Sequence, residues 1–268
     1  MSGEKYIYVS LFGRLGNNLF QLAAAASLAK RMNAYMIAIP NPNYVVPSKN
    51  PQPLSVYLKP YKKNILKAFD IREGQPLDCS IYHEPEFCYN KLPETDGIYL
   101  HGYFQSEKYF DVAEVRYLLR IEEPMEQKLQ NQYKYLLSKH PVSINVRRGD
   151  YLKMQSYHPV CTLDYFKTAM HILGKHRHFL IDSDDLEWCK SVFHGENIHF
   201  IEGLSDVESL YLQSLCSDHI ISNSTFGWWA AWLDNSPDKK VIAPKQWFGK
   251  QITHLDTKDL LPNSWTTI

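Results

Sequence analysis

The sequence predicts an α/β protein built from two Rossmann-like domains that face each other across a cleft. Its second half alternates short apolar runs with segments of helical spacing, which is typical of a parallel sheet with helices on both faces. The first half opens in the same way, with a strand, a turn and a helix. We place the boundary near residue 140, giving domains 1–140 and 141–268. Ligands of such sheets bind at the carboxyl ends of the strands, so the loops that follow strands are the candidate sites.

The individual elements follow from hydrophobic spacing and from turn residues. Residues 40–60 hold six of the 15 prolines and predict an irregular loop. The expected strands are 6–10, 35–39, 97–104, 142–146, 178–181, 197–201, 218–222 and 240–243, and the expected helices are 19–32, 122–140, 162–173, 184–193, 206–216 and 225–233. Three tryptophans in the last of these helices, Trp228, Trp229 and Trp232, have the spacing of core residues.

The composition excludes several classes of protein. Lys+Arg and Asp+Glu are equal at 29 each, so no basic excess points to a nucleic acid or an anionic membrane. The Cys count is 5, and these residues are scattered without a C-x-x-C pair, which excludes a disulfide framework and favours a reducing compartment. The N-terminus shows no signal peptide and no membrane span, which indicates a cytoplasmic location. The 18 Tyr residues fit either a carbohydrate site or an aromatic core.

Two of the loops that follow strands contain arginine. Residues 13–18 (GRLGNN) either face an anion or a sugar with their amides or form a plain turn in which an Asn caps the helix. Residues 147–150 (RRGD) follow a strand, and alternation sends Arg147 and Arg148 in opposite directions. We expect one guanidinium to bind an anion such as a diphosphate and the other to be structural, paired to Asp150. An ion-pair network and an exposed RGD adhesion motif are the alternatives.

Two further loops carry small polar residues. The run 182–185 (DSDD) has three interpretations that the sequence does not separate: a divalent-cation site, a cap for the next helix, or a carboxylate that accepts from guanine N–H groups. The run 222–227 (SNSTFG) enters a helix, so its hydroxyls and amides predict either a phosphate cradle or ordinary N-capping.

Together these loops resemble the α-1,2-fucosyltransferase family, glycosyltransferase family 11, of the bacterial type. The matching segments, in chain order, are GRLGNNLFQLAAAASLAKRM (13–32), GYFQSEKYF (102–110), VRRGDY (146–151), SDDLEWCK (183–190), SNSTFGWWAAWL (222–233) and VIAPKQWF (241–248). The resemblance implies a GT-B fold, with the acceptor on the side of the first domain (1–140) and a GDP-L-fucose donor bound by the second (141–268). It also implies that no metal or other cofactor is essential.

The resemblance further implies roles for individual residues. Arg147 would hold the diphosphate, Asp184 and Asp185 would lie at the guanine or ribose, and the loop at 222–227 would cradle the phosphates. Where relatives usually carry His, this chain has Asn145, which hydrogen bonds but cannot act as the base. The residues that we assign to the donor are Arg14, Gly16, Asn17, Asn145, Arg147, Ser183, Asp184, Asp185, Ser224, Thr225 and Phe226.

The expected reaction is an inverting transfer of L-fucose to O2 of a β-galactoside in an oligosaccharide or a lipid-linked glycan of the bacterial surface. Arg147 stabilises the leaving diphosphate, and Asp150 is the candidate base, with Glu107 and His101 as alternatives. Two other functions stay open: transfer of another GDP-deoxyhexose such as colitose, and binding of a GDP-sugar or glycan without catalysis. We expect no nucleic-acid partner, and a lipid-linked acceptor is compatible with peripheral membrane association.

Overall fold

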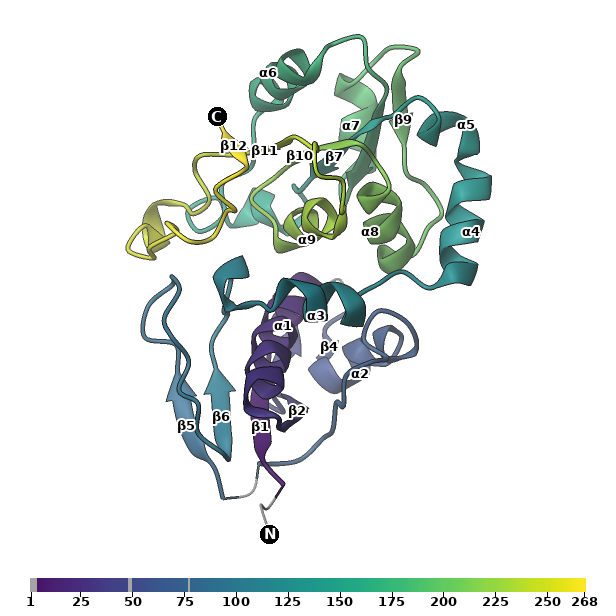
Figure 1. Ribbon diagram of the computed structural model, residues 1–268. Coiled ribbons are helices and arrows are strands. Elements are labelled where there is room, and N and C mark those ends of the chain that lie inside the picture. The colour runs from purple at the N-terminus through teal and green to yellow at the C-terminus, as the bar shows by residue number, and fades with distance from the viewer. Residues whose placement is uncertain (1–3, 48–49, 77) are drawn as a thin grey trace. The chain divides into compact units, whose positions relative to one another are not determined.

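The computed structural model describes residues 4–47, 50–76 and 78–268, and the chain divides into two compact units (Figure 1). Unit 1 comprises the residues up to Arg120 together with Leu255–Pro262, and unit 2 comprises Ile121–His254 and Asn263–Ile268. The division precedes the expected boundary near residue 140 because the intervening helices pack within unit 2. Part of the loop expected at 40–60, residues 48–49, lies outside the described residues.

Unit 1 contains a parallel sheet in the order β2-β1-β6-β5. Its strands are β1 (Tyr6–Leu11), β2 (Tyr35–Pro40), β5 (Ser80–His83) and β6 (Ile98–His101). Helix α1 (Leu15–Met32) packs on the sheet and begins four residues before the predicted start, with Arg14 as its N-cap residue. Strand β5 was not predicted, because it is a largely exposed edge strand without apolar alternation.

The rest of unit 1 consists of short elements and the late segment Leu255–Pro262. The short elements are β3 (Val45–Val46), β4 (Gln52–Pro53), α2 (Leu54–Leu58), η1 (Tyr61–Lys63), η2 (Glu107–Tyr109) and α3 (Val112–Leu118). In the late segment, the nearly buried Asp259 accepts a hydrogen bond from Tyr89 N at 3.0 Å and pairs with Lys108, while Leu260 is buried. These contacts fix the late segment to unit 1.

Unit 2 contains a parallel sheet in the order β12-β11-β10-β7-β8-β9. Its strands are β7 (Val142–Val146), β8 (Phe179–Ser183), β9 (Ile198–Phe200), β10 (Asp218–Ile221), β11 (Val241–Ala243) and β12 (Thr266–Thr267). Its helices are α4 (Glu123–Gln132), α5 (Lys134–Leu137), α6 (Leu163–Leu173), α7 (Leu186–Val192), α8 (Asp206–Ser214) and α9 (Thr225–Leu233), with the short η3 (Asp150–Lys153) and η4 (Lys250–Ile252). The strand–helix alternation predicted for this half is confirmed.

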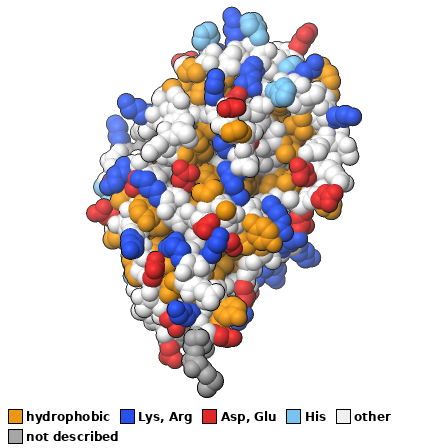
Figure 2. Space-filling model, viewed as in Figure 1, with side chains coloured by type: hydrophobic (Ala, Val, Ile, Leu, Met, Phe, Trp, Pro, Cys, Tyr) orange, Lys and Arg blue, Asp and Glu red, His pale blue; other side chains and the backbone are white. Residues whose placement is uncertain are grey.

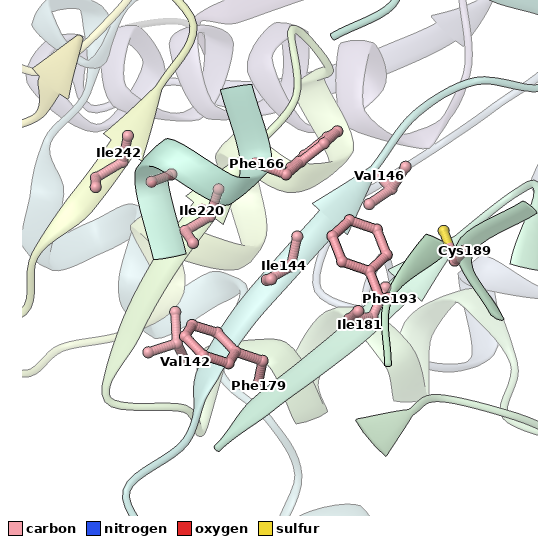
Figure 3. Packing of buried hydrophobic residues seen from close by; sticks show 11 residues of the cluster. Val142, Ile144, Val146, Phe166, Phe179, Ile181, Cys189, Phe193, Ile220 and Ile242 are labelled. Atoms are coloured by element: carbon pink, nitrogen blue, oxygen red, sulfur yellow. The ribbon is translucent and has the colours of Figure 1, made fainter. Parts of the chain in front are cut away.

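Helices cover both faces of the unit 2 sheet. On one face, Phe166 of α6 and Cys189 of α7 pack on strand residues such as Ile144 (Figure 3). Alternation turns the residues on either side of Ile144 to the other face, which α8 and α9 cover. The predicted tryptophan core is confirmed on α9, where Trp228 and Trp229 are fully buried and their ring centroids lie 5.0 Å apart.

Candidate active site

Three loops of unit 2 lie side by side at the carboxyl edge of its sheet. They follow the adjacent strands β10, β7 and β8, and the register pairs Asn145 with both Ile221 and Asp182. We call residues 147–150 the arginine loop, 183–185 the acidic loop and 222–225 the serine loop. Sequence analysis selected all three, and parallel pairing brings them together.

Arg147 is the centre of the arginine loop. Its guanidinium pairs with Asp150 through Nη2 and with Asp184 Oδ2 through Nη1, the latter at 2.8 Å, and its Cζ lies 5.1 Å from the ring centroid of Tyr151. Only 18% of its side chain is exposed. A guanidinium held from two directions presents its N–H groups in a fixed orientation, as bidentate anion recognition requires.

The acidic loop holds the backbone of the arginine loop. Asp184 Oδ1 accepts from the amides of Arg148 and Gly149 at 2.9 and 3.1 Å. A Cβ on Gly149 would lie 2.4 Å from Asp184 Oδ2, so only glycine allows this approach. Asp185 caps α7 by accepting from Trp188 N and also pairs with Arg148 Nε at 3.0 Å. The cap interpretation of the acidic loop is therefore confirmed for Asp185.

The two arginines differ from expectation in one respect. Arg148 is the structural one, since its guanidinium stacks 3.8 Å from the Trp188 ring and pairs with Asp185. Yet Arg147, the residue assigned to the diphosphate, is the one paired to Asp150. With 16% of the Arg148 side chain exposed, the stretch does not form an exposed adhesion motif.

The serine loop is tied to β7. Ser222 Oγ donates to Asn145 O at 2.9 Å and accepts from Arg147 N at 3.0 Å, so it fixes the point where the arginine loop leaves the strand. Ser224 is the N-cap residue of α9, but its side chain makes no capping hydrogen bond. N-capping by a hydroxyl, one of the two interpretations of this loop, is therefore not the role of the Ser224 side chain. A phosphate cradle formed by Ser224 with Thr225 and Phe226, which lie in the first turn of α9, stays a prediction.

Asn145 points into the protein beneath the loops. Its side chain is nearly buried, and Nδ2 donates to Asp182 Oδ2 at 2.9 Å. A Cβ on Gly227 of α9 would lie 2.7 Å from Asn145 Oδ1. Asn145 therefore joins β8 to the start of α9, and its contact with a donor stays a prediction.

Asp182 accepts a second hydrogen bond, from Ser209 Oγ of α8 at 2.6 Å. Burial raises the pKa of Asp182 to about 6, although the bond from Ser209 opposes the rise. Sequence analysis grouped Asp182 with the acidic loop, but its side chain lies on the α8 and α9 face instead.

The candidate residues of unit 1 lie at the start of α1. Arg14 Nη2 donates to Pro47 O at 2.6 Å, and Asn17 Oδ1 accepts from Gln105 Nε2 at 3.0 Å. Gly16 is buried in the first turn of α1. The alternative of a plain turn with an Asn cap is wrong, because Arg14 occupies the N-cap position. Contact of these residues with a donor stays a prediction.

The two alternative bases also belong to unit 1. The ring of His101 stacks on Phe12 with centroids 5.0 Å apart, and burial together with His83 lowers the pKa of His101. Glu107 lies in η2.

Sequence analysis missed one buried hydrogen-bonded series. Ser143 Oγ lies 2.7 Å from His219 Nδ1, and His219 Nε2 lies 3.0 Å from Asp234 Oδ2. The residue types are those of a Ser–His–Asp triad, but the two imidazole nitrogens are exchanged, since Ser143 lies at Nδ1 and Asp234 at Nε2. All three side chains are also at most 4% exposed, so no substrate reaches them. We assign this series to the core of unit 2. Across residues 4–47, 50–76 and 78–268, no group of three His, Cys, Asp or Glu residues is placed to hold a metal ion.

Comparison with known proteins relates the chain to a family and to a fold. The family model "Glycosyl transferase family 11" matches residues 2–268. An alpha-1,2-colitosyltransferase of Escherichia coli is 32% identical over 180 residues, which cover 62% of this chain and 61% of that protein. The O-antigen biosynthesis glycosyltransferase WbnK of Escherichia coli is 25% identical over an alignment of 288 residues, covering 90% of this chain and 95% of that protein.

A solved structure matches the fold. The fucosyltransferase NodZ from Bradyrhizobium superposes with a TM-score of 0.52 at 13% identity, covering 85% of this chain and 93% of that one. At that identity the likeness concerns the fold alone, and it confirms the GT-B-like class with two Rossmann-like units. Within the described residues, none of the helices has the length and apolar character to cross a membrane.

Proposed function

The chain belongs to glycosyltransferase family 11, and from that premise we propose that it transfers L-fucose from GDP-L-fucose to O2 of a β-galactoside in a surface glycan. The transfer inverts the anomeric centre and needs no metal. The observation that carries the proposal is the arginine loop. It presents a preorganised guanidinium, and the backbone N–H of Arg147 bonds to Ser222 in the loop that leads into α9. The N-terminus of that helix favours the same negative charge.

The proposed step is a single displacement. The acceptor oxygen forms a bond to C1 of the sugar while the bond from C1 to the β-phosphate oxygen breaks, and that electron pair leaves with GDP. Negative charge grows on the β-phosphate, where Arg147 stabilises it. Removing a preorganised group of this kind costs about 10²–10³ in rate.

Arg147 must exchange one partner to take part. In the proposal, a phosphate oxygen replaces Asp150 at Nη2, while Asp184 keeps Nη1 and so maintains the orientation of the guanidinium. The exchange releases the carboxylate of Asp150, which is then able to accept the proton of the acceptor hydroxyl. Donor binding and activation of the base are thereby linked through one side chain.

A second candidate is transfer of colitose from its GDP derivative. The relative with 32% identity carries the name of that activity, which favours this candidate. Asn145 does not decide between the two donors, because its side chain is held by Asp182. A panel of GDP-L-fucose and GDP-colitose against β-galactosides, with the product linkage determined by NMR, separates them.

The test of the mechanism is Arg147→Ala, with Arg177→Ala as its matched control. Arg177 also pairs with an aspartate of the same sheet, Asp218, but it precedes β8 at the amino edge. We expect Arg147→Ala to lower kcat by about 10²–10³ and Arg177→Ala to leave it near the wild-type value. Near-normal transfer by Arg147→Ala would remove Arg147 from the mechanism.

Metal independence is tested in the same assay. We expect EDTA to leave transfer intact, because Arg147 and the start of α9 supply the positive charge. Strict dependence on added Mn²⁺ or Mg²⁺ would restore the metal interpretation of the acidic loop.

A further inference from the structure

The side chain of Tyr151 lies against the guanidinium of Arg147, and the proposed function so far gives it no role. Tyr151 follows Asp150 in η3, and the Cζ atom of Arg147 lies over its ring, 5.1 Å from the centroid. The guanidinium therefore contacts a neutral ring in addition to the carboxylates of Asp150 and Asp184. The attraction between a cation and a ring face is stronger where water is excluded, and only 18% of the Arg147 side chain is exposed.

Two further contacts fix the ring of Tyr151. Its hydroxyl donates to the carbonyl oxygen of Asn223, in the serine loop, at 3.2 Å. Its ring also stacks on the imidazole of His158, with centroids 4.8 Å apart and planes inclined at 19°. One side chain thus joins the arginine loop to the serine loop, and its orientation is set by partners outside the arginine loop.

The imidazole of His158 is itself held by the segment that follows β11. Its ring centroid lies 6.0 Å from that of Phe248. The neighbouring backbone is tied to the same segment, since Gly249 N donates to Tyr157 O at 2.7 Å. A Cβ on Gly249 would lie 2.4 Å from Ser156 O, so the close approach of these two backbone segments requires glycine. The stack that supports the Tyr151 ring therefore rests on fixed backbone.

Core packing does not explain this stack. Residues 152–157 are all exposed, and Tyr151, His158 and Phe248 are only half-buried. Rings that serve the core of unit 2 are fully buried, as Trp228 and Trp229 are. The contacts of Tyr151 are directed instead to the guanidinium and to the two loops of the candidate site.

The proposed exchange at Arg147 requires a support that a phosphate does not displace. Once a phosphate oxygen has replaced Asp150, the carboxylate of Asp184 holds the guanidinium through one nitrogen, about which it can pivot. A ring face attracts the cation but carries no net charge, so it restrains the guanidinium without repelling the incoming diphosphate.

We propose that Tyr151 is a positioning residue for the transfer. Its ring holds the guanidinium of Arg147 toward the leaving β-phosphate, and its hydroxyl ties that ring to the serine loop. It acts through Arg147 rather than on the donor. The inference rests on the proposed function, since it takes Arg147 to stabilise the leaving diphosphate.

A double-mutant cycle between Tyr151 and Arg147 tests this role. We expect Tyr151→Leu to lower kcat about tenfold in the wild-type background. In the Arg147→Ala background the same substitution should change kcat less than about twofold, because the group that the ring positions is gone. A merely structural residue would lower kcat by the same factor in both backgrounds. Urea unfolding checks that each variant is folded.

Two further variants sharpen the cycle. Tyr117→Leu is the matched control, because the Cζ of Arg120 lies 4.1 Å from the centroid of the Tyr117 ring on α3 of unit 1. We expect it to leave kcat within about twofold of wild type. Tyr151→Phe keeps the ring and loses the hydrogen bond to Asn223 O, so it should keep kcat within about threefold of wild type.

Equal losses from Tyr151→Leu in the two backgrounds would overturn the inference. An unchanged kcat in the wild-type background would do the same, as would a Tyr151→Phe variant as slow as Tyr151→Leu. The cycle is also measured as GDP affinity by calorimetry, which does not depend on the sugar. A wild type that fails to transfer L-fucose would refute the proposed function, and a GDP cycle in which Tyr151→Leu weakens binding only when Arg147 is present would still support the role of Tyr151.

Discussion

Replacing Asp182 with Asn tests the buried connection beneath the candidate site. Asp182 accepts from Asn145 and Ser209, and an Asn side chain keeps one oxygen for these donors. Its new N–H₂ group needs an acceptor. Gln213 Oε1 is buried and has no hydrogen-bond partner within the described part of the chain, and the Gln213 side chain also bonds to Asp182. We therefore expect Asp182→Asn to fold and to be more stable than wild type at neutral pH.

The magnitude follows from the pKa of Asp182, which burial raises from 3.8 to about 6. A folded pKa above the unfolded one means that the native state holds the proton more tightly, so stability falls as pH rises from about 4 through about 6. Each pH unit in that window lowers the free energy of unfolding by about 1.4 kcal/mol, or by about 3 kcal/mol over the whole window. Because Asp182 keeps a partly exposed surface, solvent screening reduces this effect, and we expect wild type to lose about 1–3 kcal/mol of unfolding free energy relative to Asp182→Asn.

The assay is urea unfolding of wild type and Asp182→Asn at a series of values between about pH 4.5 and pH 7.5. The free-energy difference between the two proteins cancels the other titrating groups, and it should grow in favour of Asp182→Asn up to about pH 6 and then level off. Ser209→Ala should move the midpoint to higher pH, because it removes a hydrogen bond that lowers the pKa of Asp182. A difference that is constant across the series would refute the reasoning.

Two further substitutions test the loop and the unit division. Gly149→Ala forces the carboxylate of Asp184 away from its position, so kcat for transfer should fall about tenfold or more, while the free energy of unfolding in urea falls by about 1–3 kcal/mol. An unchanged kcat would show that this packing is irrelevant to the reaction. Asp259→Ala removes the partner of Tyr89 N and Lys108, so limited proteolysis should cut within residues 255–262 faster than in wild type. An identical cleavage pattern in the two proteins would contradict the anchoring role of Asp259.

The fold was predictable where residue patterns are strong. The strands and helices of unit 2 alternate with clear apolar runs, and the predicted order is the observed one. Edge strand β5 escaped prediction because its residues are mostly exposed. The start of α1 was placed late because GRLGNN has the composition of a turn, whereas its residues from Leu15 onward are helical and Leu15 is buried. The assignment of Leu255–Pro262 to unit 1 depends on Asp259, a long-range contact that carries no local signal.

The candidate site was predictable as a set of loops but not as a set of contacts. Loops after parallel strands share one edge, so the arginine, acidic and serine loops were expected to meet. Which carboxylate pairs with which guanidinium depends on loop geometry, and sequence alternatives for Asp184 stayed open for that reason. Asn145 illustrates the limit most clearly. Its position in the motif suggested a donor contact, whereas strand alternation and the closeness of Gly227 direct it into the interior.

The pairing of Arg147 bears on why the site contains so many acidic groups. Two arginines and three aspartates, Asp150, Asp184 and Asp185, share the two neighbouring loops, so the site without donor is not a bare cationic patch. A free guanidinium would bind any phosphate, whereas one already paired yields only to a ligand that replaces the lost ion pair and gains further contacts. A diphosphate at the start of α9 meets that condition, because the helix N-terminus adds its own attraction. In the proposed mechanism, the carboxylates therefore raise selectivity for the nucleotide sugar over inorganic phosphate at some cost in affinity.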